Sequence, residues 1–115
     1  MKMIGAFPVY GQVIDNETRC KHYHSERDVV AIKFRCCKKY YPCYLCHQEA
    51  EEHAIAVWDK KDFDQRAILC GVCKRELAIK EYLHAERCPH CQAAFNPGCS
   101  LHYHLYFEVE KHEKG

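Results

Sequence analysis

The amino-acid sequence predicts a small α+β fold, made of short strands and held together by bound metal. Of 115 residues, 24 are Leu, Ile, Val or Phe, which is a thin supply for a conventional apolar core. Nine of the ten cysteines lie between residues 20 and 91, most of them in closely spaced pairs. Because a structural zinc site contributes about 10 kcal/mol to folding, we expect a zinc-stabilised domain whose cysteine turns are zinc knuckles.

Twelve cysteine and histidine side chains lie at spacings typical of metal ligands. A Cys-x-x-Cys turn places two thiolates a few ångström apart with backbone N–H groups aimed at them. Three such turns in one short stretch indicate zinc rather than a single redox pair. Four ligands to each ion give about three Zn²⁺ per chain. The candidate ligands are Cys20, His22, Cys36, Cys37, Cys43, Cys46, His47, His53, Cys70, Cys73, Cys88 and Cys91.

The last four of these ligands form two Cys-x-x-Cys turns separated by 14 residues. This spacing is typical of a zinc ribbon, so these cysteines are expected to share one ion in a zinc-ribbon-like C-terminal lobe.

The other eight ligands are expected to form an interleaved lobe with two zinc ions. Neighbouring ligands such as Cys36-Cys37 and Cys46-His47 are expected to point apart, so that each pair serves two ions. The expected sharing is Cys20, His22 and His47 with one cysteine of the pair Cys36-Cys37, and Cys43, Cys46 and His53 with the other.

Cys99, His102 and His104 leave two interpretations open. They could supply half of a fourth site, but two further ligands are not evident, and a buried thiol near supporting histidines is favoured. The remaining histidines are expected at the surface or beside the metal sites. They are His24, His84, His90 and His112.

Short strands are expected at 9–14, 29–34 and 67–69, where β-branched or alternating residues occur. Residues 48–53 are strong helix formers, which predicts a helix of barely two turns. A charged connector is expected over 59–66.

Two later segments fit more than one structure. Residues 76–87 fit a helix or a strand, and a strand that crosses from knuckle to knuckle is favoured. Residues 101–109 alternate between apolar and polar side chains, which favours a strand, although Pro97 could also open a helix.

A disulfide framework is the competing explanation for ten cysteines. The first residues lack the apolar stretch of a signal peptide, no run approaches membrane-spanning length, and the histidines sit at ligand spacings. We therefore expect a protein of a reducing compartment, the cytoplasm, without a membrane contact.

Charge and motifs bear on partners and on catalysis. Nine thiolates and three Zn²⁺ would change the formal charge from +1 to about −2, so nucleic-acid binding is not favoured. His24-Ser25-Glu26 and Pro42-Cys43-x-x-Cys46 match the zinc-deaminase pattern formally, but only fifteen residues separate them, too few for that enzyme's packing. We expect no enzyme activity.

In their order and spacing, the twelve ligands together with Tyr23, Tyr41-Pro42 and Gly71 resemble the CHY-type zinc finger family, over about residues 20–91. The resemblance implies a three-zinc fold that uses these twelve positions. In that family the module occurs at the N-terminus of RING-type ubiquitin ligases, where it contributes to partner binding. The module also occurs in small free-standing proteins, and one of these proteins is found in the mitochondrial intermembrane space.

This chain is similar to the free-standing form in its length and in the segment 95–104. No RING ligand series follows Cys99, so the resemblance does not imply ligase activity. We expect one domain, 1–115, with a motif core at 20–91 and an extension at 92–115. The expected function is a non-catalytic multi-zinc module for protein interaction or for zinc and thiol handling, with an unidentified protein partner. A nucleic-acid-binding zinc-ribbon protein is the alternative.

Overall fold

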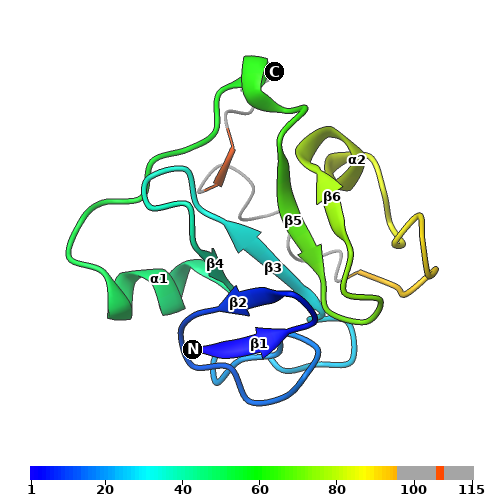
Figure 1. Ribbon diagram of the computed structural model, residues 1–115, viewed down its shortest axis with the longest axis horizontal. Coiled ribbons are helices and arrows are strands. Elements are labelled where there is room, and N and C mark those ends of the chain that lie inside the picture. The colour runs from blue at the N-terminus through cyan, green and yellow to red at the C-terminus, as the bar shows by residue number, and fades with distance from the viewer. Residues whose placement is uncertain (96–105, 108–115) are drawn as a thin grey trace, which may run out of the picture.

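In the part of the chain that the structure describes, six short strands form one mixed sheet (Figure 1). The computed structural model describes residues 1–95 and 106–107. Across the sheet the order is β1-β2-β4-β3-β5-β6. The strands are β1 (Lys2–Ile4), β2 (Phe7–Val9), β3 (Val30–Lys33), β4 (Tyr40–Tyr41), β5 (Arg66–Cys70) and β6 (Glu76–Ala78). The helices are α1 (Tyr44–Ala50), α2 (Ile79–Leu83) and the 3₁₀ turn η1 (Lys60–Asp62). The predicted α+β fold of short strands is confirmed.

The central pair of strands joins the two halves of the chain. β3 lies antiparallel to both β4 and β5, with Val30 opposite Cys70 and Ile32 opposite Ile68. Helix α1 lies beside β4, and α2 lies on the other side of the view beside β6 (Figure 1). The expected N-terminal and C-terminal lobes therefore share one sheet.

Apolar side chains cover both faces of β5. Ile68 belongs to the large core with Phe34, Tyr41 and Tyr82, and Leu69 points to a smaller cluster on the opposite face. This follows from the two-residue period of a strand, which sends successive side chains to opposite faces. Ile68 and Leu69 are both fully buried, so this short strand contributes to the apolar cluster on each face of the sheet.

The knuckle after β5 packs against the N-terminal half without room for a side chain. The N–H of Gly71 donates to the carbonyl of Val29 at 2.6 Å. A Cβ at Gly71 would lie 2.2 Å from the carbonyl oxygen of Glu17. Glycine is therefore required here by a close backbone approach.

The strand expected over 9–14 is wrong in its position. β2 ends at Val9, and Val13 pairs again only through an isolated bridge. Between them Gly11 has a φ of +95°, and a Cβ there would lie 2.6 Å from the Cβ of Cys46. The chain leaves the sheet at this point and passes directly against that cysteine.

The strands expected at 29–34 and 67–69 are confirmed as β3 and β5. Helix α1 replaces the helix expected over 48–53: it begins four residues earlier and ends at Ala50, so residues 51–53 lie outside it. Its first turn is capped because the Sγ of Cys43 accepts the N–H of Cys46 at 3.4 Å. A potential metal ligand thus also starts the helix.

The segment 76–87 contains both of the alternatives, since β6 is followed directly by α2. The connector 59–66 contains η1 and the start of β5. The strand expected over 101–109 lies outside the described residues except for Tyr106 and Phe107, which are both buried. Within the part that the structure describes, no helix is long and apolar enough to cross a membrane.

Candidate metal centre

The structure brings the twelve candidate ligands together in three groups of four. Within each group the ligand atoms lie within 4.8 Å of one another. Cluster 1 is Cys20, His22, Cys43 and Cys46; cluster 2 is Cys36, Cys37, His47 and His53; cluster 3 is Cys70, Cys73, Cys88 and Cys91. Three groups of four agree with the predicted three Zn²⁺.

The sulfur spacing tests whether zinc fits these groups. The Sγ atoms of Cys20 and Cys43 lie 3.7 Å apart, and the Cys70–Cys91 pair in cluster 3 has the same separation. A tetrahedral ion with Zn–S bonds of about 2.3 Å needs sulfurs about 3.8 Å apart. A disulfide needs about 2.05 Å, and the nine described cysteines are free thiols. The donor sets therefore fit tetrahedral zinc.

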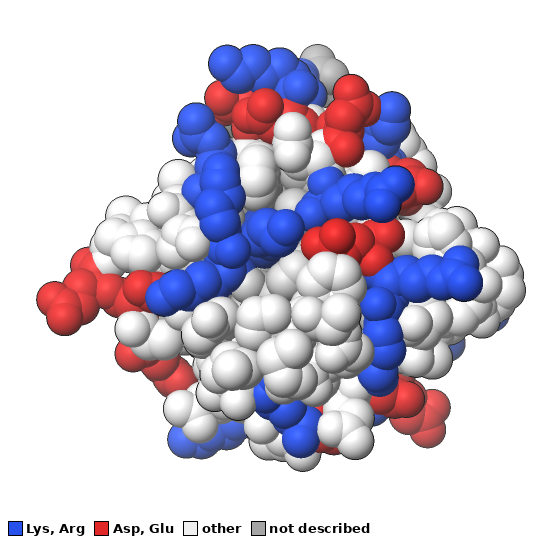
Figure 2. Space-filling view, viewed as in Figure 1, with Lys and Arg blue, Asp and Glu red and all other residues white. Residues whose placement is uncertain are grey.

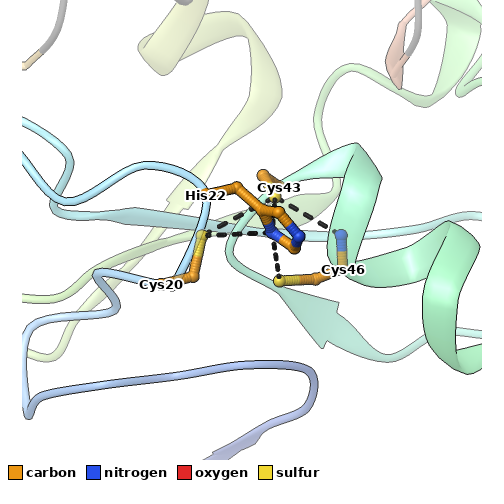
Figure 3. A group of neighbouring side chains, drawn as sticks. All are labelled: Cys20, His22, Cys43 and Cys46. Carbon is orange, nitrogen blue, oxygen red and sulfur yellow. Dashed lines mark hydrogen bonds between the residues drawn. The ribbon is translucent and has the colours of Figure 1, made fainter.

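Cluster 1 is assembled from the loop before β3 and the start of α1. Figure 3 shows its four side chains converging, with His22 turned toward the sulfurs. The Nδ1 atom of His22 lies 3.5 Å from the Sγ atoms of both Cys43 and Cys46. This geometry assigns Nδ1 as the metal-facing nitrogen of His22.

The other ring nitrogen of His22 is held by a carboxylate. Nε2 lies 3.0 Å from Oε2 of Glu49, which follows Cys46 by three residues on α1 and so shares its helical face. This hydrogen bond with Glu49 is the main cause that raises the pKa of His22. A carboxylate on the far nitrogen fixes the ring and increases its basicity toward a metal.

Cluster 2 lies between the β3–β4 turn and α1. Nε2 of His47 lies 3.2 Å from the Sγ of Cys36 and 3.2 Å from Nε2 of His53. His47 is fully buried and its ring stacks on Phe34 at 4.5 Å. Burial lowers the pKa of His47, which keeps a lone pair on the imidazole for a metal.

The turns that start at Phe34, Cys70 and Cys88 share one hydrogen-bond geometry. In each turn, the backbone N–H of the first residue donates to the carbonyl of the residue five positions later. The carbonyl of the first residue accepts from the N–H of the residue four positions later, and all these distances are 2.8–3.0 Å. The fifth residue has a φ between +58° and +67° in all three turns. The β3–β4 turn is therefore a third knuckle of the same shape.

The expected sharing of ligands in the N-terminal lobe is wrong. In cluster 3 the ligands of each knuckle are its first and fourth residues, but in the Phe34 knuckle they are its third and fourth, Cys36 and Cys37. The turn points these neighbours into one group rather than apart. Cys46 and His47 do serve different groups, because successive helical residues point about 100° apart.

Cluster 3 lies between two knuckles that face each other. The Sγ atoms of Cys73 and Cys88 lie 3.7 Å apart, as do those of Cys70 and Cys91. Burial is the largest cause that raises the pKa of Cys70. A dicationic metal would offset the charge of thiolates in such a site. The grouping of these four cysteines is the one that the sequence predicts.

The nine described cysteines include no member of the possible fourth site. Cys99, His102, His104 and the tail residue His112 lie outside the described residues. His24, His84 and His90 belong to none of the three clusters. His24 does not join Cys43 as the deaminase pattern would require, because Cys20 and His22 complete that group.

Sequence reasoning missed two carboxylates beside the clusters. Glu49 backs cluster 1, and Glu51 lies near cluster 2 with its Oε1 3.7 Å from Nδ1 of His53. Glu51 also accepts hydrogen bonds from the hydroxyl of Tyr41 and from Nζ of Lys39. Glu49 follows Cys46 by three residues on α1, and Glu51 follows His47 by four residues at the C-cap of α1; these spacings are the signal that could have found them.

Comparison with known proteins agrees with this geometry. The CHY zinc finger profile matches residues 20–97. The chain belongs to the CHY zinc finger family. It is 46% identical over 104 residues to Helper of Tim protein 13 of Saccharomyces cerevisiae, which covers 87% of this chain and 90% of the relative.

Two further relatives show the same extent of similarity. Helper of Tim protein 13 of Kluyveromyces lactis is 44% identical over 99 residues, covering 86% of this chain and 87% of the relative. An uncharacterized protein of Schizosaccharomyces pombe is 45% identical over 100 residues, covering 87% and 88%. The resemblance to the free-standing form of the CHY family is therefore confirmed.

We expect about three zinc ions per chain, and we expect Cys70 and Cys88 to hold the same one. Elemental analysis should give about three zinc per wild-type chain. Cys70→Ser, Cys88→Ser and the double variant should each retain about two, because all three changes open one site. Combining Cys70→Ser with Cys43→Ser should leave about one. A Cys70/Cys88 double variant that retained only one zinc would show that the two cysteines bind different ions.

Proposed function

We propose that this CHY zinc finger protein is a non-catalytic module that handles zinc and thiols for a protein partner, and that exchange takes place at cluster 2. The observation that carries this proposal is the contrast between cluster 2 and the other two groups. Membership of the CHY zinc finger family supports zinc binding, and the accessibility and weaker ligand support of cluster 2 favour exchange at that site.

Cluster 2 is the most accessible of the three groups. Cys36 and Cys37 are half-buried and His53 is exposed, whereas all three cysteines of cluster 1 are buried. An incoming thiolate or chelator takes over a zinc ion by displacing a ligand that it can reach. Cluster 2 offers three such ligands.

The ligands of cluster 2 are also less firmly supported. Nδ1 of buried His47 has no hydrogen-bond partner among the described residues. Nδ1 of His53 lies 3.7 Å from Oε1 of Glu51, the nearby carboxylate. In cluster 1 the corresponding distance, from His22 to Glu49, is 3.0 Å. Losing the partner of a ligating histidine costs about 10–100-fold in metal affinity. The zinc in cluster 2 should therefore leave first.

The donor count supports a non-catalytic role. Catalytic zinc keeps a position open for water, with three protein ligands. Each of the three groups here offers four protein donors. We propose on this ground that the zinc ions are structural or exchangeable, without an activated water.

The charge pattern favours a protein partner over nucleic acid. Figure 2 shows Lys and Arg side chains in a band across this face, with Asp and Glu between them. A phosphate backbone needs a continuous basic surface. A mixed surface is typical of a site that meets another protein.

We include the mitochondrial intermembrane space in the proposal, in place of the cytoplasm that the sequence predicts. The name Helper of Tim protein 13 of two relatives and the free-standing form of the family in that compartment support this choice. Protease protection of the tagged chain in mitochondria before and after the outer membrane is opened tests it. A signal confined to the cytosolic fraction would contradict this location and support the cytoplasm instead.

A chromophoric chelator added to the zinc-loaded chain should release one zinc at least about tenfold faster than the other two. Cys37→Ser should lose this fast phase and retain two slowly released ions. Glu49→Gln should move a second zinc toward the fast phase, because His22 loses its carboxylate. Glu52→Gln is the matched control, since Glu52 is exposed and lies just beyond α1, and it should leave the release unchanged.

Three zinc ions released at one rate would contradict the proposal. So would a fast phase that persists in Cys37→Ser, because the exchangeable ion would then lie in cluster 1 or cluster 3.

A further inference from the structure

A groove of about 520 Å³ lies beside the knuckle that carries Cys36 and Cys37. Four of its seven lining side chains are cationic and one is acidic. The lining residues are Lys33, Arg35, Lys38, Trp58, Asp62, Gln65 and Arg66. We call this feature the basic groove.

The two arginines of the basic groove are only loosely paired within the part of the chain that the structure describes. Nζ of Lys33 lies 3.4 Å from Glu76, and the guanidinium of Arg35 lies 4.0 Å from Asp59. Arg66 is exposed at the start of β5. The long Arg35–Asp59 contact between two exposed side chains contributes little, so Arg35 and Arg66 are available to an anionic ligand. Lys33, in contrast, is partly neutralised by the mostly buried Glu76.

The floor of the groove is fixed. Trp58 is 6% exposed, and its Nε1 donates to the backbone carbonyl of Lys33 at 2.7 Å. Nζ of Lys38 lies 4.9 Å from the centre of the indole ring, which holds this ammonium over the ring. A ligand would therefore meet a Lys38 ammonium that is positioned before it binds.

The groove adjoins the exchangeable zinc of the proposed function. Arg35 and Lys38 are the residues on either side of Cys36-Cys37 in the Phe34 knuckle. The two cations therefore lie in the same tight turn as two ligands of cluster 2. A segment bound in the groove is held next to that zinc.

We propose that the basic groove binds an acidic segment of a partner protein, rich in Asp or Glu, and holds that partner beside cluster 2. Four cations against one carboxylate give the charge complementarity that selects such a segment. The inference rests on the proposed function in making cluster 2 the reason for docking. Peptide binding itself does not require zinc transfer.

A carboxylate-bearing segment fits better than a nucleic acid. Asp62 lies in the groove, and Asp59 and Glu76 lie beside Arg35 and Lys33. These acids interrupt the positive surface, so a long phosphate backbone, which needs a continuous basic track, would have to pass carboxylates beside the groove. A short acidic peptide needs only the groove.

The test measures binding of a fluorescent peptide of eight glutamates to the zinc-loaded full chain by anisotropy, with an eight-glutamine peptide as the reference. The wild-type chain should bind the glutamate peptide and not the glutamine peptide. Arg35→Glu combined with Arg66→Glu should weaken binding at least about tenfold, because two attractions become repulsions.

The matched control is Lys21→Glu combined with Lys80→Glu. Both lysines are exposed and lie outside the groove, Lys21 adjoins a cluster ligand as Arg35 does, and the change in net charge is the same. Binding by this control should stay within about twofold of the wild type. Zinc content verifies the fold of each variant, and Arg66→Gln alone, at an exposed position away from the ligands, should still weaken binding if the double variant fails to fold.

Three results would overturn the proposal. The first is failure of the groove to select the glutamate peptide, seen either as no binding or as equal loss in both double variants. The second is tighter binding of a single-stranded oligonucleotide that the Arg35/Arg66 variant loses, which would assign the groove to phosphates. The third is displacement by a peptide of residues 108–115, which would assign it to the chain's own C-terminal segment.

The docking inference and the proposed function can fail separately. Fast release of one zinc without peptide binding would remove the inference alone. Peptide binding through the groove with uniform zinc release would remove the proposed exchange and leave the docking site.

Discussion

Tetrahedral coordination by four side chains from separate segments is the constraint on which the rest of this structure depends. Cluster 1 ties the loop before β3 to the start of α1, cluster 2 ties the β3–β4 turn to the end of α1, and cluster 3 ties the β5–β6 hairpin to the last knuckle. The strands between these points are two to five residues long, too short to be stable alone. Metal bonds fix the ends, and the sheet forms between them.

Helix α1 supplies ligands to both N-terminal clusters and also causes the difference in how firmly their ligands are held. It carries Cys46 of cluster 1 and His47 of cluster 2 at successive positions, and Glu49 on the face that backs His22. The same short helix therefore supports one cluster well and leaves the other with a ring nitrogen that has no hydrogen-bond partner among the described residues. This asymmetry is what makes one zinc a candidate for exchange, and the basic groove beside it a candidate for holding the protein that takes part.

The sequence predicts the chemistry of these sites better than their connections. Cys70, Cys73, Cys88 and Cys91 are grouped correctly because two Cys-x-x-Cys turns at this separation are typical of a zinc ribbon. Cys36-Cys37 is different, because its knuckle begins at Phe34 and the spacing alone does not show that the turn points both cysteines one way. The early start of α1 and the end of β2 at Val9 were missed for a related reason: Cys43 caps the helix, and the chain passes tightly against Cys46 at Gly11.

The measurement that tests this account most directly is far-UV circular dichroism during heating, recorded with and without complete removal of zinc by a chelator under reducing conditions. The account predicts that the metal-free chain loses its cooperative transition and its far-UV signal together, because the short strands and α1 join segments that the metal ligands hold in place. Return of zinc should restore both. A sharp transition in the metal-free chain would contradict the account and show that the apolar core folds without metal.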